Sequence, residues 1–305
     1  MKFELTILGS NAAFPANGKF TTAQVLNINE AYFLIDCGEG TQIRLREYRV
    51  KYSKINHIFI SHVHGDHILG LPGLLGSLGL LGRKKPLHIY CPSGVQAFFE
   101  AFIKYTNVRK IEYPIHFHVH QSTEPTIILD NKNVRVSTIP LLHDVPTTGF
   151  LIQEKEKPRK MLKEKIEQYN IPFQVINDIK NGADFQLENG EIIKNEELTT
   201  AAPKPRAYAF CSDTAYNETM FSQIKNVDLL YHEATFGDEK LADLQERNIH
   251  STARQAGKTA RKVKAKQLII GHFSPRYKDL QPLLLQAQEE FKNTELAIDG
   301  RVFSV

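Results

Sequence analysis

The stretch from His62 to His67 carries four side chains that can bind a metal ion within six residues. It reads HVHGDH, so three imidazoles and one carboxylate surround Gly65. Imidazole nitrogens and carboxylate oxygens are the ligands of borderline divalent metals such as zinc. A glycine lets the backbone turn sharply, so that ligands on both sides of it can converge. The spacing and the turn together predict a metal site that includes His62, His64, Asp66 and His67.

Three further candidate ligands share one placement in the chain. His143, Asp213 and His272 each lie just past a segment that reads as a strand, as the HVHGDH stretch does. Ligands at the same ends of several strands can form one site on a rigid scaffold. The seven candidates are too many for one tetrahedral zinc ion. They suit two metal ions that share a carboxylate, with Asp213 as the bridge, and such a pair activates water for hydrolysis.

The strands that must position these ligands are interspersed with helices along the chain. Runs rich in β-branched and aromatic residues, bounded by turn residues, predict the strands. They cover residues 3–9, 24–36, 55–60, 87–90, 133–141, 207–210, 227–231 and 268–270, with a short strand at the end of the chain. Helices are predicted over residues 41–48, 72–81, 93–106, 252–264 and 280–291. This interspersed order predicts a layered α/β architecture.

Other polar residues near strands have a more ordinary interpretation. His116, His118 and His120 recur at period two and would share one face of a strand, but they have no carboxylate or turn that could enclose a metal. We therefore interpret them as a solvated strand face. Asp36 at the end of a strand is either a turn residue or a partner that orients a ligand histidine. Cys211 is interpreted as a buried thiol.

The composition predicts one large domain built around sheets. The chain has 305 residues, of which 42% are hydrophobic and 24% charged, with a formal net charge of +4. The three cysteines are odd in number and far apart in the sequence, which favours a reducing compartment. The N-terminus lacks a signal-peptide pattern, and the most apolar run, residues 68–82, is too short to cross a membrane. We expect a cytoplasmic protein without a membrane segment.

The composition changes after residue 152. Residues 153–170 contain six basic and four acidic residues, and residues 171–200 are polar and broken by Pro172, Gly182 and Gly190. This change predicts an insertion or arm at residues 153–200 rather than part of the core.

The HxHxDH pattern, with a later His, Asp and His, resembles the metallo-β-lactamase superfamily. The wider segments ISHVHGDHILGLPGLLGS, CSDT, HEATF, HSTARQA and GHFSPRY resemble its ribonuclease Z family, and these matches span roughly the whole chain. The resemblance implies a four-layered αββα sandwich formed by a single domain over residues 1–305. It also implies that residues 153–200 are an inserted, protruding arm.

The resemblance implies a zinc-dependent endoribonuclease that removes the 3′ trailer from precursor tRNA and leaves a 3′-hydroxyl on the tRNA. One zinc ion would bind His62, His64 and His143, the other Asp66, His67 and His272, with Asp213 bridging them. Asp66 would also accept a proton from the attacking water. His250 of the HST motif, with Glu233 of the HEATF motif, would protonate the departing oxygen, because an alkoxide leaves poorly without a proton.

The resemblance also implies partners. The arm would grip the body of the tRNA, and a homodimer would bring the partner subunit's arm to the same tRNA. The arm offers Lys155, Lys157, Arg159, Lys160, Lys163 and Lys165 to backbone phosphates. Composition alone would make the same residues a solvated helix face. Residues 171–175 read IPFQV, where many relatives have a Gly/Pro-rich element, so the grip would differ in detail.

Two other functions stay open at this point. The same fold hosts hydrolases of small esters, thioesters and sulfates, but such an enzyme has no use for a basic arm or for the HEATF and HSTARQA segments. A catalytically idle RNA-binding module is the third interpretation. The complete set of metal ligands argues against it, because an idle relative could lose ligands without cost.

Overall fold

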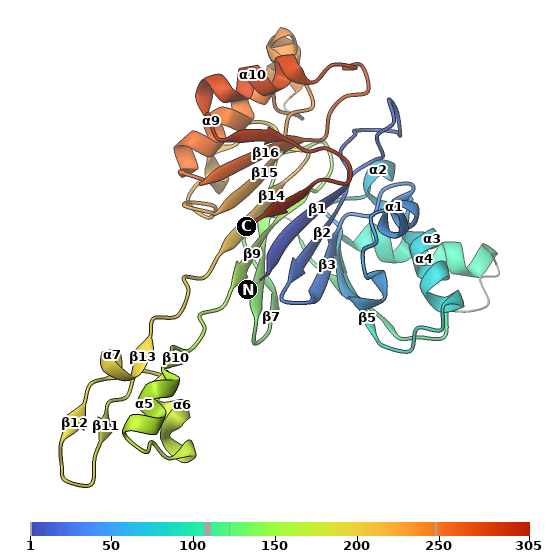
Figure 1. Cartoon of the computed structure of the whole chain (residues 1–305). Helices are drawn as coiled ribbons and strands as arrows, with labels where there is room; N and C mark the ends of the chain where they lie inside the picture. Colours follow the sequence, from blue (N-terminus) through green and yellow to red (C-terminus); the bar gives the residue numbers. More distant parts are fainter. Residues whose placement is uncertain (1, 107–110, 122, 248) are drawn as a thin grey trace. The chain divides into compact units, whose positions relative to one another are not determined.

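The computed structural model describes residues 2–106, 111–121, 123–247 and 249–305, and they form two compact units. The main unit comprises Met1–Asn131, Arg135–Ile152 and Ala207–Val305. The small unit comprises Lys132–Val134 and Gln153–Arg206. Figure 1 draws the whole chain, coloured along the sequence.

The first sheet of the main unit has seven strands in the order β18-β1-β2-β3-β4-β5-β6. Their bounds are β18 Val302–Ser304, β1 Phe3–Gly9, β2 Ala23–Ile28, β3 Ala31–Ile35, β4 Ile55–Phe59, β5 Leu87–Cys91 and β6 Ile115–Val119. The pairs from β3 to β6 are parallel, so these strands end at one edge of the sheet. The HVHGDH stretch follows β4 directly.

The second sheet also has seven strands, in the order β17-β16-β15-β14-β9-β8-β7. Their bounds are β17 Thr294–Leu296, β16 Gln267–Gly271, β15 Leu229–Glu233, β14 Ala207–Cys211, β9 Thr148–Glu154, β8 Val134–Pro140 and β7 Ile127–Asp130. The pairs from β14 to β17 are parallel. This common direction brings the residues that follow β14, β15 and β16 to one edge of the sheet.

The two sheets face each other, and helices cover their outer faces (Figure 1). Helices α1 (Thr41–Glu47), α3 (Leu71–Leu80) and α4 (Ser93–Thr106) pack on the first sheet, and α9 (Ala253–Val263) and α10 (Gln281–Glu290) on the second. Aromatic contacts join the inner faces, with the rings of Phe59 and Phe150 5.4 Å apart. The predicted αββα sandwich is confirmed.

The main helices lie where the sequence predicts them. Helix α9 begins with a capping box, in which the Thr252 side chain accepts from the backbone of Gln255 and the Gln255 side chain accepts from the backbone of Thr252. The remaining helices are short: α2 Gly65–Ile68, α5 Lys163–Gln168, α6 Ile176–Lys180, α7 Asn195–Leu198 and α8 Leu241–Arg247.

The predicted single strand over residues 24–36 is wrong, because a hairpin divides it into β2 and β3. Asn29 and Glu30 at the turn have φ angles of 51° and 68°. A two-residue turn of this kind needs positive φ at both positions, and it usually contains glycine. The sequence provides no glycine there, so the turn had no recognisable signal. Strands β7 and β9 also went unrecognised.

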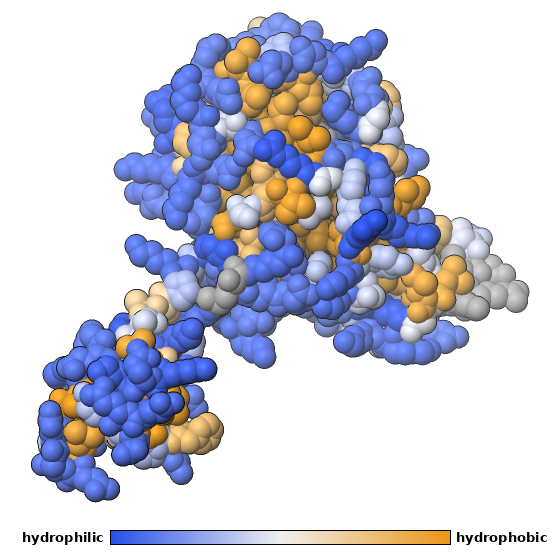
Figure 2. Space-filling view, in the orientation of Figure 1, coloured by the Kyte–Doolittle hydropathy of each residue, from blue (hydrophilic) through white to orange (hydrophobic). Residues whose placement is uncertain are grey.

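The small unit has its own apolar core of Met161, Ile171, Ile179, Ile193 and Leu198. Two short antiparallel pairs frame it: β10 (Lys160–Met161) with β13 (Thr199–Thr200), and β11 (Phe185–Gln186) with β12 (Ile192–Ile193). Hydrophilic side chains cover most of its face in Figure 2.

All three cysteines are free and buried, Cys211 among them, as expected. Across the described residues no helix combines the length and the apolar character needed to span a membrane.

Candidate metal centre

The seven predicted ligands converge where four strands of the two sheets end. The HVHGDH stretch follows β4, His143 follows β8, Asp213 follows β14, and His272 follows β16. Potential ligand atoms of the described residues lie within 4.8 Å of one another in five overlapping groups. Three of these groups contain only predicted ligands: His62, His64 and His143; His62, His67 and Asp213; and Asp66, His67 and His272. The other two contain His250: His143, Asp213 and His250; and Glu233, His250 and His272.

Asp213 stands between the two ends of this cluster. Its Oδ2 lies 3.0 Å from Nε2 of His67, and its Oδ1 lies 3.2 Å from Nε2 of His272. At the other end of the cluster, Nδ1 of His64 lies 3.1 Å from Nε2 of His62 and 3.4 Å from Nε2 of His143. The two oxygens of one carboxylate therefore face different imidazoles.

The donor atoms fit a divalent metal. Nε2 of His67 is buried and has no hydrogen-bond partner among the described residues, although it lies 3.0 Å from the Asp213 carboxylate. A nitrogen and an oxygen so close, without the geometry of a hydrogen bond, can be satisfied together by a cation between them. Imidazole and carboxylate donors around one buried point form a metal site.

Hydrogen bonds behind the centre fix three of the imidazoles. Nδ1 of His67 lies 2.7 Å from Oδ2 of Asp36, Nδ1 of His143 lies 2.7 Å from the Ile249 carbonyl, and Nδ1 of His272 lies 2.9 Å from Oγ1 of Thr235. Each contact leaves Nε2 directed into the centre, and such outer contacts orient metal-binding histidines. Asp36 thus orients His67, a candidate ligand.

The backbone is strained at three residues in and around the metal centre. Asp36, Asp213 and His272 have φ angles of 56°, 55° and 58°. These angles lie in the left-handed region that residues with a side chain rarely adopt. Each residue follows a strand of the main unit. Left-handed residues outside turns persist where the surrounding structure holds them, and they concentrate at functional sites.

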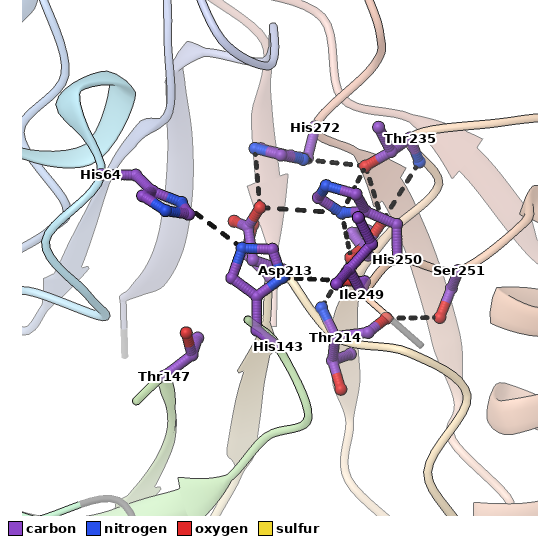
Figure 3. A network of polar contacts seen from close by, with 12 residues as sticks. His64, His143, Thr147, Asp213, Thr214, Thr235, Ile249, His250, Ser251 and His272 are labelled. Atoms are coloured by element: carbon purple, nitrogen blue, oxygen red, sulfur yellow. Dashed lines mark hydrogen bonds and ion pairs between the residues drawn. The ribbon is translucent and has the colours of Figure 1, made fainter. Parts of the chain in front are cut away.

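Glu233 and His250 form a pair beside the cluster. Figure 3 labels His250 of this pair. Nδ1 of His250 lies 2.9 Å from Oε1 of Glu233. The backbone N–H of Thr214 and the hydroxyl of Thr235 donate to the two carboxylate oxygens, at 2.6 and 2.5 Å. The ring centres of His250 and His143 are 5.0 Å apart.

The Glu233 carboxylate favours a protonated His250. Burial would lower the pKa of His250, but the charge and the hydrogen bond of Glu233 outweigh it and raise the pKa to about 9. Burial likewise opposes a charged Glu233, and His250 nevertheless holds the pKa of that carboxyl below its usual range. The pair can therefore present a proton at neutral pH.

A cleft of about 410 Å³ opens onto these residues. Its walls include Ala13, Phe236 and Ser274 together with metal-centre residues. The backbone N–H of Ala13 donates to Oδ2 of Asp66 at 2.7 Å, which fixes that carboxylate from the cleft side. Ala13 and Thr235 went unrecognised as supporting residues in the sequence, although Thr235 lies within the HEATF segment.

His116, His118 and His120 lie away from the ligand groups. His116 and His118 are exposed on β6, as expected, and Nε2 of His118 lies 2.9 Å from Nδ1 of His88. The prediction is wrong for His120, which follows β6, has both ring nitrogens buried and meets the Phe150 ring edge-on.

Two facing sheets with this cluster of candidate metal ligands at their strand ends define a protein of the metallo-β-lactamase fold. YhfI of Bacillus subtilis, a protein of that fold, is similar with a TM-score of 0.70 at 19% identity, over all of both chains. Human tRNase Z, short form, is similar with a TM-score of 0.69 at 25% identity, over 99% of both chains.

Relatives in sequence narrow this class to one family. Ribonuclease Z of Bacteroides thetaiotaomicron is 45% identical over 304 residues, which are 100% of this chain and 96% of the relative. Ribonuclease Z of Cytophaga hutchinsonii is 45% identical over 306 residues, with 100% and 97% covered. Residues 3–156 also match the family model described as "Anti-Pycsar protein Apyc1". The chain belongs to the ribonuclease Z family.

Proposed function

We propose that the protein is an endoribonuclease that cuts the 3′ trailer from precursor tRNA and leaves a 3′-hydroxyl on the tRNA. The observation that carries this proposal is the Glu233–His250 pair beside a cluster of metal ligands, because it places a proton donor where a leaving oxygen needs one. Full-length relatives named ribonuclease Z and the likeness to human tRNase Z support the choice of substrate.

The metal centre would hold two zinc ions. One would bind His62, His64 and His143, the other would bind Asp66, His67 and His272, and Asp213 would bridge them. Two of the groups of close donor atoms match this division: His62, His64 and His143; and Asp66, His67 and His272. When bound, such a pair lowers the pKa of a water molecule and stabilises charge on the phosphoryl oxygens.

The residues of the chain move the protons. Asp66, held by the Ala13 N–H, accepts a proton from the attacking water as the water oxygen bonds to phosphorus. The bond from phosphorus to the 3′-oxygen of the tRNA breaks, and His250 protonates that oxygen. Glu233 keeps His250 charged and oriented before the transfer. The phosphate stays on the trailer.

The small unit, which includes residues 153–200, would bind the body of the tRNA. Lys160 and Lys163 are exposed, which suits contacts with backbone phosphates. Lys157 pairs with Glu154 at 3.0 Å, and Nε of Arg159 donates to Thr199 at 2.6 Å. These two residues have partners inside the unit, so Lys160 and Lys163 are the first contacts to test.

The protein would act as a homodimer in the cytoplasm. Ile43 on α1 and Leu80 and Leu81 at the end of α3 are 56%, 70% and 65% exposed. They line a groove of about 840 Å³. Neighbouring exposed apolar side chains of this kind mark interaction surfaces. Three free, buried thiols suit a reducing compartment.

One assay separates this function from hydrolysis of small esters. Purified protein is incubated with a 3′-extended precursor tRNA and, in parallel, with chromogenic esters, each with and without a chelator. We expect a single cut in the RNA that the chelator abolishes. Chelator-sensitive ester hydrolysis without a cut in the RNA would refute the proposal.

A further inference from the structure

Three histidines lie together on one face of the first sheet, outside the metal centre. His88 on β5 pairs in register with His116 on β6, and His118 lies two residues further along β6. Leu87 and Ile89, on either side of His88, belong to the apolar core under the helices, so the histidines project from the opposite face of the sheet. His88 is half-buried, and His116 and His118 are exposed.

The rings of these histidines present their edges rather than their faces. The His88 ring stacks against those of His116 and His118, with centres 5.1 and 5.2 Å apart and planes within 28° of each other. The His57 ring of β4 stacks against His88 from the next strand, at 5.3 Å. Neighbouring rings therefore cover both faces of His88. Both nitrogens of an imidazole lie at the ring edge, so the group can bind through nitrogen atoms.

These imidazoles are already in the form that binds a metal. Burial, followed by the charges of His118, His116 and Arg83, lowers the pKa of His88. Burial and the charge of His116 lower the pKa of His118. Both rings are therefore neutral at neutral pH, and a metal ion need not displace a proton to bind them.

The closest nitrogens of the group set the geometry that a metal would adopt. Nδ1 of His88 lies 2.9 Å from Nε2 of His118. Two neutral imidazoles at this distance share a hydrogen bond, and a metal ion can replace the shared proton. An ion about 2.0 Å from each nitrogen would hold them at an angle of about 90°, whereas tetrahedral zinc would need them about 3.3 Å apart. Right angles between nitrogen ligands are typical of tetragonal Cu²⁺ and Ni²⁺.

We propose that His88 and His118 form a second metal site, with His116 as a third ligand, which takes Cu²⁺ and, less tightly, Ni²⁺. Cu²⁺ binds nitrogen donors more strongly than the other divalent ions of its row. His116 is exposed and lies beside His88, so its side chain can turn a nitrogen towards the same ion. A bound ion would tie the edge strand β6 to β5. The inference does not depend on the proposed cleavage of tRNA.

Titration of the zinc-loaded protein with Cu²⁺ tests the site. We expect one Cu²⁺ ion to bind to each chain without release of zinc. Its electron paramagnetic resonance spectrum should be tetragonal, with splitting from at least two imidazole nitrogens. Ni²⁺ should compete for the same site. Release of zinc in step with the uptake of Cu²⁺ would place the copper in the metal centre and overturn the inference.

Variants at single histidines assign the ligands. His118→Ala removes an exposed ring, and His88→Phe removes two nitrogens but keeps a ring in the stack. Each should weaken Cu²⁺ binding by at least about tenfold, since loss of even an outer contact has such an effect at other metal sites. His116→Ala should weaken it less. His57→Phe is the matched control and should bind Cu²⁺ as the wild type does.

Two further results would overturn the inference. One is a wild type that binds no Cu²⁺ beyond the metal centre. The other is a double variant, His88→Phe with His118→Ala, that binds Cu²⁺ as tightly as the wild type and gives the same spectrum. Thermal unfolding without added copper shows whether each variant is folded. A protein that fails to cut precursor tRNA would refute the proposed function and leave this site unaffected, because the readout is metal binding.

Discussion

Oε1 of Glu233 lies 2.9 Å from Nδ1 of His250 at the edge of the metal centre. Glu233 is fully buried, and donors from Thr214 and Thr235 occupy its two oxygens. The carboxylate therefore cannot turn away from the imidazole. The fixed Glu233 carboxylate stabilises the proton on the partly exposed His250 and also orients its imidazole.

Replacing His250 by alanine should slow cleavage and leave the metal in place. General acid catalysis by a side chain typically contributes about 10²- to 10⁴-fold, so we expect a fall in kcat within that range. Single-turnover cleavage of precursor tRNA and the zinc content of the purified variant measure the two effects. The exposed His116→Ala is the matched control. Loss of zinc from His250→Ala would show that His250 is a ligand.

Glu233→Gln should shift the pH dependence of cleavage to lower pH. His250 acts in its protonated form, and Glu233 raises its pKa to about 9. A neutral amide removes that charge, so the pKa of His250 falls and activity is lost at a lower pH as the pH rises. The pH profile of kcat measures the shift. An unchanged basic limb would mean that another group donates the proton.

Asp36→Asn should weaken metal binding without removing a ligand. Oδ2 of Asp36 lies 2.7 Å from Nδ1 of His67 and also accepts from the Ser61 hydroxyl at 2.9 Å. Loss of such an outer contact typically lowers metal affinity by about 10- to 100-fold. Competition with a chromogenic zinc chelator measures the affinity. Unchanged affinity would leave Asp36 with a purely structural role at the strand end.

The sequence was enough to predict which candidate ligands lie together, because these residues follow strands directly. The hydrophobic runs before His143, Asp213 and His272 predicted the strand ends, and the parallel strands β14 to β16 bring the ends at Asp213 and His272 to one edge. Nothing in the sequence shows which nitrogen of each imidazole faces the metal centre. That choice depends on partners distant in the sequence, such as the Ile249 carbonyl behind His143.

The parts of the fold that were missed depend on similar distant contacts. The turn at Asn29 and Glu30 uses left-handed backbone without glycine, so its local sequence resembles a continuous strand. Strand β9 runs directly into the small unit, where the composition changes, and the change concealed the strand. Its pairing in the second sheet is what defines it.

The exposed groove between α1 and α3 predicts a variant that stays monomeric. Leu80→Asp combined with Leu81→Asp places two charges in the apolar groove, which should prevent its burial against a second copy. Analytical ultracentrifugation should find a dimer for the wild type and a monomer for the variant. Leu285→Asp on α10, where the side chain is 52% exposed, is the control and should remain dimeric. A wild-type monomer would refute the proposed homodimer.

The small unit should lose stability in acid through Glu154. Its carboxylate accepts from Nε and Nη2 of Arg206 at 2.8 and 3.0 Å and from Lys157 at 3.0 Å. Burial would raise the pKa of Glu154, but these hydrogen bonds and the Arg206 charge lower it from 4.5 to about 2. A pKa that is lower in the folded state means that the charged form stabilises the fold.

The contribution of Glu154 is therefore present above about pH 4.5 and is lost as the pH falls towards 2. With an allowance for solvent screening, we expect Glu154→Gln to lower the free energy of unfolding by about 1 to 2 kcal/mol at pH 7. The difference from the wild type should shrink as the pH falls, because the wild-type carboxylate becomes neutral as well. Urea unfolding at a series of pH values measures it, with the exposed Glu156→Gln as control. A difference that stays constant with pH would assign the effect to packing rather than to charge.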